Sequence, residues 1–202
     1  MSKLLCVTNR GLCKGDFLQR IEEICRQKPA GILLREKDLS PGEYEQLAGR
    51  VLNICRANGV PCILHSFVQA AQHLQADSIH MPLPLLRSLA PEQRAGFRQL
   101  GASCHSVQDA REAQALGCTY ITAGHVFATD CKKGLAPRGL VFLQQVCSSV
   151  TIPVYAIGGI APERMEAVLR AGAAGACVMS GAMACTDIQA YLKQFSESEQ
   201  SI

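Results

Sequence analysis

The residues best suited to chemistry lie in one segment, residues 123–139, with the sequence AGHVFATDCKKGLAPRG. His125 follows a short apolar run and opens a polar loop that also carries Lys132. Histidine takes up and releases a proton near neutral pH, which suits it to proton transfer. On residue type alone, a structural hydrogen-bonding role at a rim stays open for His125. Together with the glycine turns that follow it, the segment favours proton transfer on a phosphorylated small molecule.

Two glycine-containing turns come after the histidine segment, Gly158-Gly159-Ile160 and Ser180-Gly181. Glycine has no Cβ, so its backbone can adopt a positive φ and its N–H group can approach an anion closely. Ser180 and Gly181 also lie just before an expected helix, where free N–H groups and the helix dipole favour negative charge. A single Gly-Gly pair is equally consistent with a tight turn. Two such turns in consecutive strand–helix units predict that these five residues bind a substrate phosphate group.

Cationic side chains follow an earlier apolar run, where Arg35 and Lys37 end the sequence GILLREK. An arginine can donate two parallel hydrogen bonds to a carboxylate. Arg35 and Lys37 are therefore candidates for binding an anionic group of the substrate. The alternative for both residues is a salt bridge to the neighbouring Glu36 or Asp38.

The other histidines and the cysteines are expected to have supporting roles. His65, His80 and His105 fall near expected strand ends and are predicted to be structural or to line a pocket, whereas His73 is predicted to lie on a helix surface. Eleven cysteines are present, which is an odd number, and no Cys-x-x-Cys pair occurs. We therefore predict reduced thiols and neither a disulfide framework nor a zinc site.

The bulk composition argues against several classes of protein. The chain has 20 Lys and Arg against 17 Asp and Glu, with the basic residues scattered and no Trp. This balance favours neither nucleic acid nor a membrane surface as a partner. No signal peptide is expected, and no apolar run approaches the roughly 18 residues that a membrane span needs. We predict a cytoplasmic protein that binds a small molecule; its oligomeric state is left open, with a homo-oligomer as one outcome.

Short apolar runs alternate with amphipathic stretches about eight times along the 202 residues. Continuous apolar runs favour a parallel sheet buried on both faces. Eight strand–helix units without a linker predict one (β/α)8 barrel domain over residues 1–202, with an open doubly wound sheet as the alternative. Residues 197–202 are expected to form a frayed polar tail. The expected strands are residues 4–8, 31–35, 60–65, 78–81, 100–104, 120–122, 153–157 and 176–179. The expected helices are residues 16–27, 41–58, 67–75, 84–96 (one helix or two helical turns), 107–116, 139–149, 162–171 and 183–195.

Three groups of residues carry a family resemblance. They are Leu34-Arg35-Glu36-Lys37, the segment GHVFATDCKKGL from Gly124, and the two glycine turns. Over residues 4–195 the chain resembles the thiamine phosphate synthase/TenI superfamily, and the GHVFATDCKKGL segment is similar to its thiazole tautomerase (TenI) branch. The resemblance implies a (β/α)8 barrel, and it implies that Arg35, Lys37, Ser103 and Lys132 bind substrate.

The chain departs from the synthase branch at the positions that would hold magnesium. That branch joins a thiazole phosphate to a pyrimidine pyrophosphate with Mg²⁺, and carries acidic residues after the third and fourth strands. Here these places hold His65-Ser66 and His80-Met81-Pro82-Leu83, and Leu33 stands where the synthase has a glutamine. Magnesium prefers carboxylate and phosphate oxygens. The departures therefore weaken the synthase interpretation and predict no metal site.

The tautomerase resemblance implies a specific reaction. This branch aromatises a thiazole carboxylate phosphate by moving a proton from ring C2 to the exocyclic carbon, which requires no cofactor. The resemblance places that proton shuttle on His125, which stands where the synthase carries a proline. Two alternatives are kept: a thiamine phosphate synthase with substitute ligands, and a non-catalytic regulator that binds the thiazole phosphate.

Overall fold

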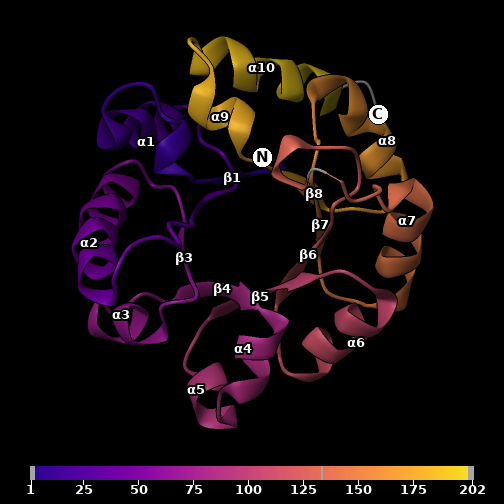
Figure 1. Ribbon diagram of the computed structural model, residues 1–202, viewed down its shortest axis with the longest axis horizontal. Coiled ribbons are helices and arrows are strands. Elements are labelled where there is room, and N and C mark those ends of the chain that lie inside the picture. The colour runs from indigo at the N-terminus through magenta and orange to yellow at the C-terminus, as the bar shows by residue number, and fades with distance from the viewer. Residues whose placement is uncertain (1–2, 133, 200–202) are drawn as a thin grey trace.

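A closed ring of eight parallel strands forms the centre of the computed structural model, which describes residues 3–132 and 134–199 (Figure 1). Each strand pairs with its neighbours in chain order, and β1 pairs with both β2 and β8. The ring therefore has no edge strand, which confirms the (β/α)8 barrel and excludes the open doubly wound sheet. The strands are β1 (Leu4–Val7), β2 (Gly31–Leu34), β3 (Cys62–His65), β4 (Ser78–Pro82), β5 (Gln99–Cys104), β6 (Tyr120–Gly124), β7 (Val154–Ile157) and β8 (Gly175–Val178).

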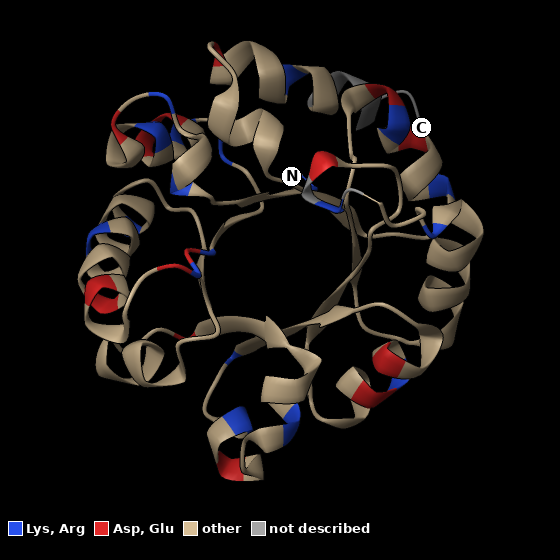
Figure 2. Cartoon of the chain, viewed as in Figure 1, with Lys and Arg blue, Asp and Glu red and all other residues tan. Residues whose placement is uncertain are grey.

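Helices surround the strands on the outside of the ring (Figure 1). Figure 2 shows the charged residues on these outer helices and on the connecting loops, and none of the eight strands contains one. In the described part of the chain, no helix combines the length and the apolar character that crossing a bilayer requires. The α-helices are α1 (Phe17–Arg26), α2 (Pro41–Ala57), α3 (Val68–His73), α4 (Leu83–Ser88), α5 (Pro91–Ala95), α6 (Val107–Ala115), α7 (Gly139–Ser149), α8 (Met165–Arg170), α9 (Ser180–Ala184) and α10 (Ile188–Glu199), and the 3-10 turns are η1 (Arg10–Leu12), η2 (Asp130–Lys132) and η3 (Pro162–Arg164).

Two of the expected helices are interrupted. The one expected over residues 84–96 divides into α4 and α5, because Pro91 begins a new helix and cannot continue the preceding one. The last one begins earlier than expected, at Ser180, and breaks at the extended residue Cys185 before α10 starts. Helix α10 then runs to Glu199, so residues 197–199 are helical where a tail was expected, and residues 200–202 lie outside the described residues.

The start of α2 illustrates how local sequence sets an element boundary. The Ser40 side chain accepts a hydrogen bond from the Glu43 amide, and the Glu43 carboxylate accepts one from the Ser40 amide at 2.9 Å. Pro41 occupies the first helical position, where its missing N–H costs nothing. This capping box fixes where the helix begins, and such a cap contributes about 1 kcal/mol to stability.

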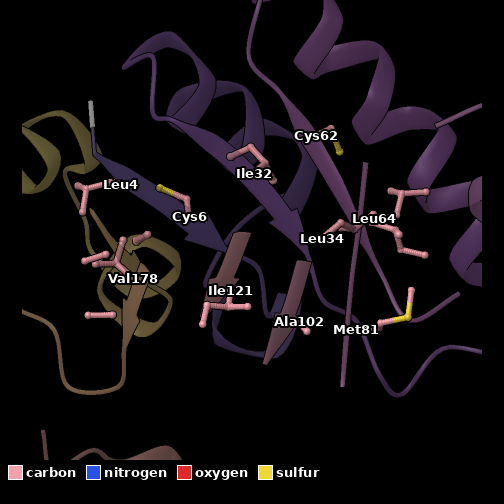
Figure 3. Packing of buried hydrophobic residues seen from close by; sticks show 14 of the residues in the cluster. Leu4, Cys6, Ile32, Leu34, Cys62, Leu64, Met81, Ala102, Ile121 and Val178 are labelled. Atoms are coloured by element: carbon pink, nitrogen blue, oxygen red, sulfur yellow. The ribbon is translucent and has the colours of Figure 1, made fainter. Parts of the chain in front are cut away.

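Alternate strand residues form two separate apolar cores. Side chains that point outward, such as Leu4, Ile32, Leu64 and Ile121, pack beneath the helices in one large cluster (Figure 3). Side chains that point inward fill the barrel in a second, smaller cluster. That inner cluster consists of Leu5, Val7, Leu33, Ile63, Tyr120 and Cys177. Because the interior is filled, any ligand site lies toward the ends of the strands, and barrel enzymes use the carboxyl ends.

Candidate functional site

The end of β2 is held by a buried carboxylate that leaves its cationic neighbours unpaired. Glu36 is buried and accepts hydrogen bonds from the Thr8 hydroxyl at 2.6 Å and from the Arg10 amide at 3.0 and 3.1 Å. Thr8 in turn accepts a hydrogen bond from the Arg35 amide at 2.9 Å. These bonds fix the backbone on either side of Arg35.

The salt-bridge alternative for Arg35 and Lys37 does not hold. Arg10 takes both nearby acids: its guanidinium donates to the Asp38 carboxylate at 2.7 and 3.1 Å and lies 3.7 Å from Glu36. Among the described residues, neither Arg35 nor Lys37 forms an ion pair. Their charges are therefore available to an anion at this end of the barrel.

Lys132 belongs to the same group of cations, although it comes from the distant β6 loop. Burial lowers the pKa of Lys37, and the positive charges of Arg35 and Lys132 lower it further. Like charges held close together repel one another, and a bound anion relieves that repulsion. The structure thus brings together three of the predicted substrate-binding residues, and we call Arg35, Lys37 and Lys132 the cationic cluster.

The first glycine turn directs its amides away from the β6 loop. The carbonyl of Ile157 accepts from the Val126 amide at 2.9 Å, and that of Gly158 accepts from the Phe127 amide at 3.0 Å. In a trans peptide the N–H points opposite to the C=O. The amides of Gly158 and Gly159 therefore point away from β6, toward β8, which lies on the other side of β7. Ile160 is half-buried and follows in the same turn.

Both glycines of this turn also have a packing reason to be glycine. Their φ angles are +96° and +65°, a region that side chains other than glycine disfavour. A Cβ on Gly158 would lie 2.3 Å from the Cβ of His125, and one on Gly159 would lie 2.4 Å from the Ala128 carbonyl oxygen. The turn is therefore packed directly against the histidine segment.

The second predicted phosphate-binding turn forms the start of α9. Ile157 pairs with Cys177 across β7 and β8, so the two turns follow neighbouring strand ends at the same level. No side chain caps α9, which leaves the first-turn amides of Ser180 and Gly181 without a capping partner. Gly181 also serves packing, because a Cβ there would lie 2.2 Å from the Tyr191 hydroxyl.

His125 lies at the rim, beside the first turn. Its position follows from the register, since Gly124 pairs with Ile157 and the next residues are His125 and Gly158. The imidazole Nε2 lies 3.3 Å from the Leu135 carbonyl oxygen. A carbonyl only accepts, so Nε2 carries the hydrogen in this contact and Nδ1 is left as the basic nitrogen. The side chain is half-buried, as a proton-transferring group that must meet a ligand requires.

Two of the three histidines predicted to be structural or to line a pocket, His65 and His80, are buried, whereas the third, His105, is exposed. Burial lowers the pKa of His65 to about 3, with Arg35 and Lys37 contributing, and burial lowers the pKa of His80 to about 3, with His65 contributing. Both rings are therefore neutral at physiological pH. The Nε2 atom of His80 lies 2.9 Å from the Ser103 hydroxyl oxygen, which connects this buried pair to a predicted substrate-binding residue.

Sequence patterns did not single out Tyr120, whose hydroxyl lies 3.0 Å from Nδ1 of His80. The signal that could have found it is Gly101, a glycine inside β5. A Cβ on Gly101 would lie 2.2 Å from the Tyr120 ring and 2.5 Å from Nδ1 of His80. Glycine inside a strand marks a place where another group approaches closely.

The donor set at these strand ends does not fit magnesium. Strand β3 ends at His65 and β4 ends at Pro82, so neither supplies a carboxylate. The carboxylate of Glu36, at the end of β2, already accepts three hydrogen bonds. Across residues 3–132 and 134–199 there is no group of three or more His, Cys, Asp or Glu side chains suited to hold a metal ion.

Fold and site together define a (β/α)8 barrel with two glycine turns and a histidine at the rim formed by the carboxyl ends of its strands. Residues 4–182 match the family model described as thiamine monophosphate synthase, so the chain belongs to that family of thiamine-biosynthesis enzymes. A thiamine-phosphate synthase from Syntrophomonas wolfei is 32% identical over 193 residues, covering 92% of this chain and 90% of its own. One from Chloroflexus aurantiacus is 34% identical over 199 residues, covering 95% of this chain and 90% of its own.

A solved structure agrees with this placement. Thiamine phosphate pyrophosphorylase from Pyrococcus furiosus superposes with a TM-score of 0.85 at 26% identity, covering 98% of this chain and 96% of its own. The superfamily resemblance is thereby confirmed. These relatives carry the synthase name, so the tautomerase branch is a proposal for this chain.

Proposed function

We propose that this chain is a thiazole tautomerase that aromatises a thiazole carboxylate phosphate. The observation that supports the proposal is the packing of His125 against the Gly158–Gly159 turn, together with a ring nitrogen, Nδ1, that is left to accept a proton. A phosphate held by these amides and by the start of α9 would present the attached ring to His125.

The reaction needs one group that both accepts and returns a proton. In the proposed step, Nδ1 of His125 removes the proton from ring C2, and the C2–H electron pair moves into the ring. The exocyclic double bond shifts, and the exocyclic carbon takes the proton back from the imidazolium. One C–H bond breaks and one forms, so no oxidant, reductant or co-reactant is consumed.

The cationic cluster supplies a second anion site for the same substrate. A thiazole carboxylate phosphate carries two anionic groups at opposite ends of the molecule. The phosphate would occupy the glycine turns, and the carboxylate would lie near Arg35, Lys37 and Lys132. Negative charge that develops on the ring and carboxylate after proton removal is stabilised by these unpaired cations.

Thiamine phosphate synthase is the second candidate, and the names of the relatives favour it. Its two phosphorylated substrates would also match two anion sites. The difference lies in the metal: the strand ends of this chain offer His65, Ser66 and Pro82 in place of carboxylates for magnesium. This donor set is the reason for ranking proton transfer first.

One experiment separates the two candidates. The purified chain is incubated with the non-aromatic thiazole carboxylate phosphate in D₂O, and NMR follows loss of the C2 proton and the appearance of either protium or deuterium at the exocyclic carbon. In parallel, thiazole phosphate, pyrimidine pyrophosphate and Mg²⁺ are supplied and thiamine phosphate is measured. We expect catalysed tautomerisation and no coupling. Efficient coupling without tautomerisation would reverse the ranking, and binding without either reaction would indicate a regulator.

A further inference from the structure

A line of three side chains crosses the inside of the barrel from Tyr120 through His80 to Ser103. The Tyr120 hydroxyl lies 3.0 Å from Nδ1 of His80, and Nε2 of His80 lies 2.9 Å from Oγ of Ser103. Tyr120 and His80 are each 2% exposed, whereas Ser103 is half-buried. The line therefore begins in the core and ends where a ligand can reach it.

The hydrogen-bond partners of Tyr120 determine which group donates and which accepts along this line. Among the described residues, His80 is the one partner of the Tyr120 hydroxyl, and no buried side-chain polar atom is left unsatisfied. If Nδ1 carried the hydrogen, the tyrosine oxygen would accept and its own buried proton would have no acceptor. An unsatisfied buried donor costs about 1–3 kcal/mol. The tyrosine therefore donates to Nδ1.

The hydrogen bond from Tyr120 also determines how the His80 ring bonds to Ser103. Burial lowers the pKa of His80 to about 3, so the ring is neutral and has one N–H. With Nδ1 accepting from Tyr120, that hydrogen is on Nε2 and is donated to Oγ of Ser103. The serine then keeps its own hydroxyl hydrogen free, because it has accepted from His80 instead of donating to it.

We propose that Tyr120 is a positioning residue: by fixing the tautomer of His80, it sets Ser103 as a hydrogen-bond donor toward the ligand. The site would then select a ligand with an acceptor at this point, such as a carboxylate oxygen, a phosphoryl oxygen or a ring nitrogen. The assignment of the ligand as a thiazole carboxylate rests on the proposed function, but the direction of the line does not.

Gly101 provides the space that the arrangement requires. A Cβ at this position would lie within 2.5 Å of both the Tyr120 ring and Nδ1 of His80. Tyr155 offers a matched comparison, because its ring packs edge-on against Tyr120 at 5.9 Å between centroids. Tyr155 is also in the inner core, but the structure gives its hydroxyl no contact with His80.

The first test measures the tautomer directly in the full chain. Long-range ¹H–¹⁵N NMR of the ¹⁵N-labelled protein, with His80 assigned through its backbone, distinguishes a protonated Nε2 from a protonated Nδ1. We expect the Nε2–H form in the wild type and in Tyr155→Phe, and its loss or mixing in Tyr120→Phe. Observation of the Nδ1–H form in the wild type would overturn the proposal without any variant or substrate.

The second test asks whether Tyr120 acts through Ser103. For the thiazole carboxylate phosphate, Tyr120→Phe should raise KM about tenfold with little change in kcat, whereas Tyr155→Phe should not. In a Ser103→Ala background the same substitution should have no further effect on KM, because the group it positions is gone. Additive effects would contradict positioning through Ser103. If the chain does not turn over this compound, the proposed function fails, and the NMR result still decides the direction of the line.

Discussion

The Cβ of His125 occupies the space that a side chain on Gly158 would need, since an ideal Cβ built there lies only 2.3 Å from it. This relationship couples the candidate catalytic residue to the candidate phosphate-binding turn. The β6 loop and the β7 turn are further joined by hydrogen bonds from Val126 and Phe127 to Ile157 and Gly158. A change in the turn is therefore expected to displace the histidine, and the two cannot vary independently.

Gly158→Ala should destabilise the protein more than Gly117→Ala. Both glycines have a positive φ, +96° and +92°, so both substitutions carry a strain of roughly 1–2 kcal/mol. Only Gly158 faces a clash, because nothing lies within 4 Å of the Cβ position at Gly117. Overpacking should add about 1–3 kcal/mol at Gly158. Urea unfolding measures the difference in the free energy of unfolding. Equal losses of stability in the two variants would show that His125 moves aside for the new methyl group without an energetic cost.

His125→Asn should abolish tautomerisation while leaving binding of the thiazole phosphate largely intact. Asparagine keeps a hydrogen-bonding side chain at the rim but cannot shuttle a proton at neutral pH. NMR of the tautomers measures turnover, and calorimetric titration of the product measures binding. His73→Asn is the control, because His73 is exposed and contacts Glu45 on the outer helices. Wild-type turnover by His125→Asn would show that another group carries the proton.

The barrel itself could be predicted from the sequence, because eight apolar runs of strand length recur between amphipathic helices. The capped start of α2 at Ser40-Pro41 was predictable for the same kind of local reason. The breaks within the expected helices were harder to place: Pro91 permits a helix start as well as an interruption, and the extended conformation of Cys185 has no comparable signal in its residue type.

The candidate site was predictable as a set of residues but not as a set of contacts. Arg35 and Lys37 had two acids beside them in the sequence, and nothing local indicated that Arg10 from the β1 loop would take both. The direction of the Tyr120–His80–Ser103 line depends on three different strands meeting inside a closed barrel. Such long-range pairings carry no signature in the spacing of residues along one segment.

Lys37→Met should weaken binding of the thiazole carboxylate phosphate by about tenfold, since an unpaired cation is removed. Lys14→Met is the control, because Lys14 is exposed on the loop before α1.

The pKa of Lys37 is lowered in the free protein, and a bound anion should raise it again. Binding at a pH approaching the ordinary lysine pKa of about 10.4 should therefore take up protons. Calorimetry in two buffers of different ionisation enthalpy measures that uptake. Its persistence in Lys37→Met would assign it to another group.

His80→Gln should reduce the amount of folding stability that the protein loses as the pH falls. The pKa of His80 is lowered to about 3 in the folded protein, whereas an unfolded histidine titrates near about 6.5. Between these values the unfolded chain binds a proton that the folded chain does not, so stability falls as the pH falls. The slope for one such group is about 1.4 kcal/mol per pH unit.

Urea unfolding at about pH 6 and about pH 4, two values between the folded and unfolded pKa of His80, measures how the free energy of unfolding changes with pH for each variant. Replacing His80 removes one titrating group, so the loss of stability between the two conditions should shrink, even if the variant is less stable at neutral pH because Tyr120 and Ser103 lose their shared partner. His73→Gln, at an exposed position on the outer helices, is the comparison for removing a histidine elsewhere in the chain. The same slope in both variants would contradict a lowered pKa for His80 in the folded protein.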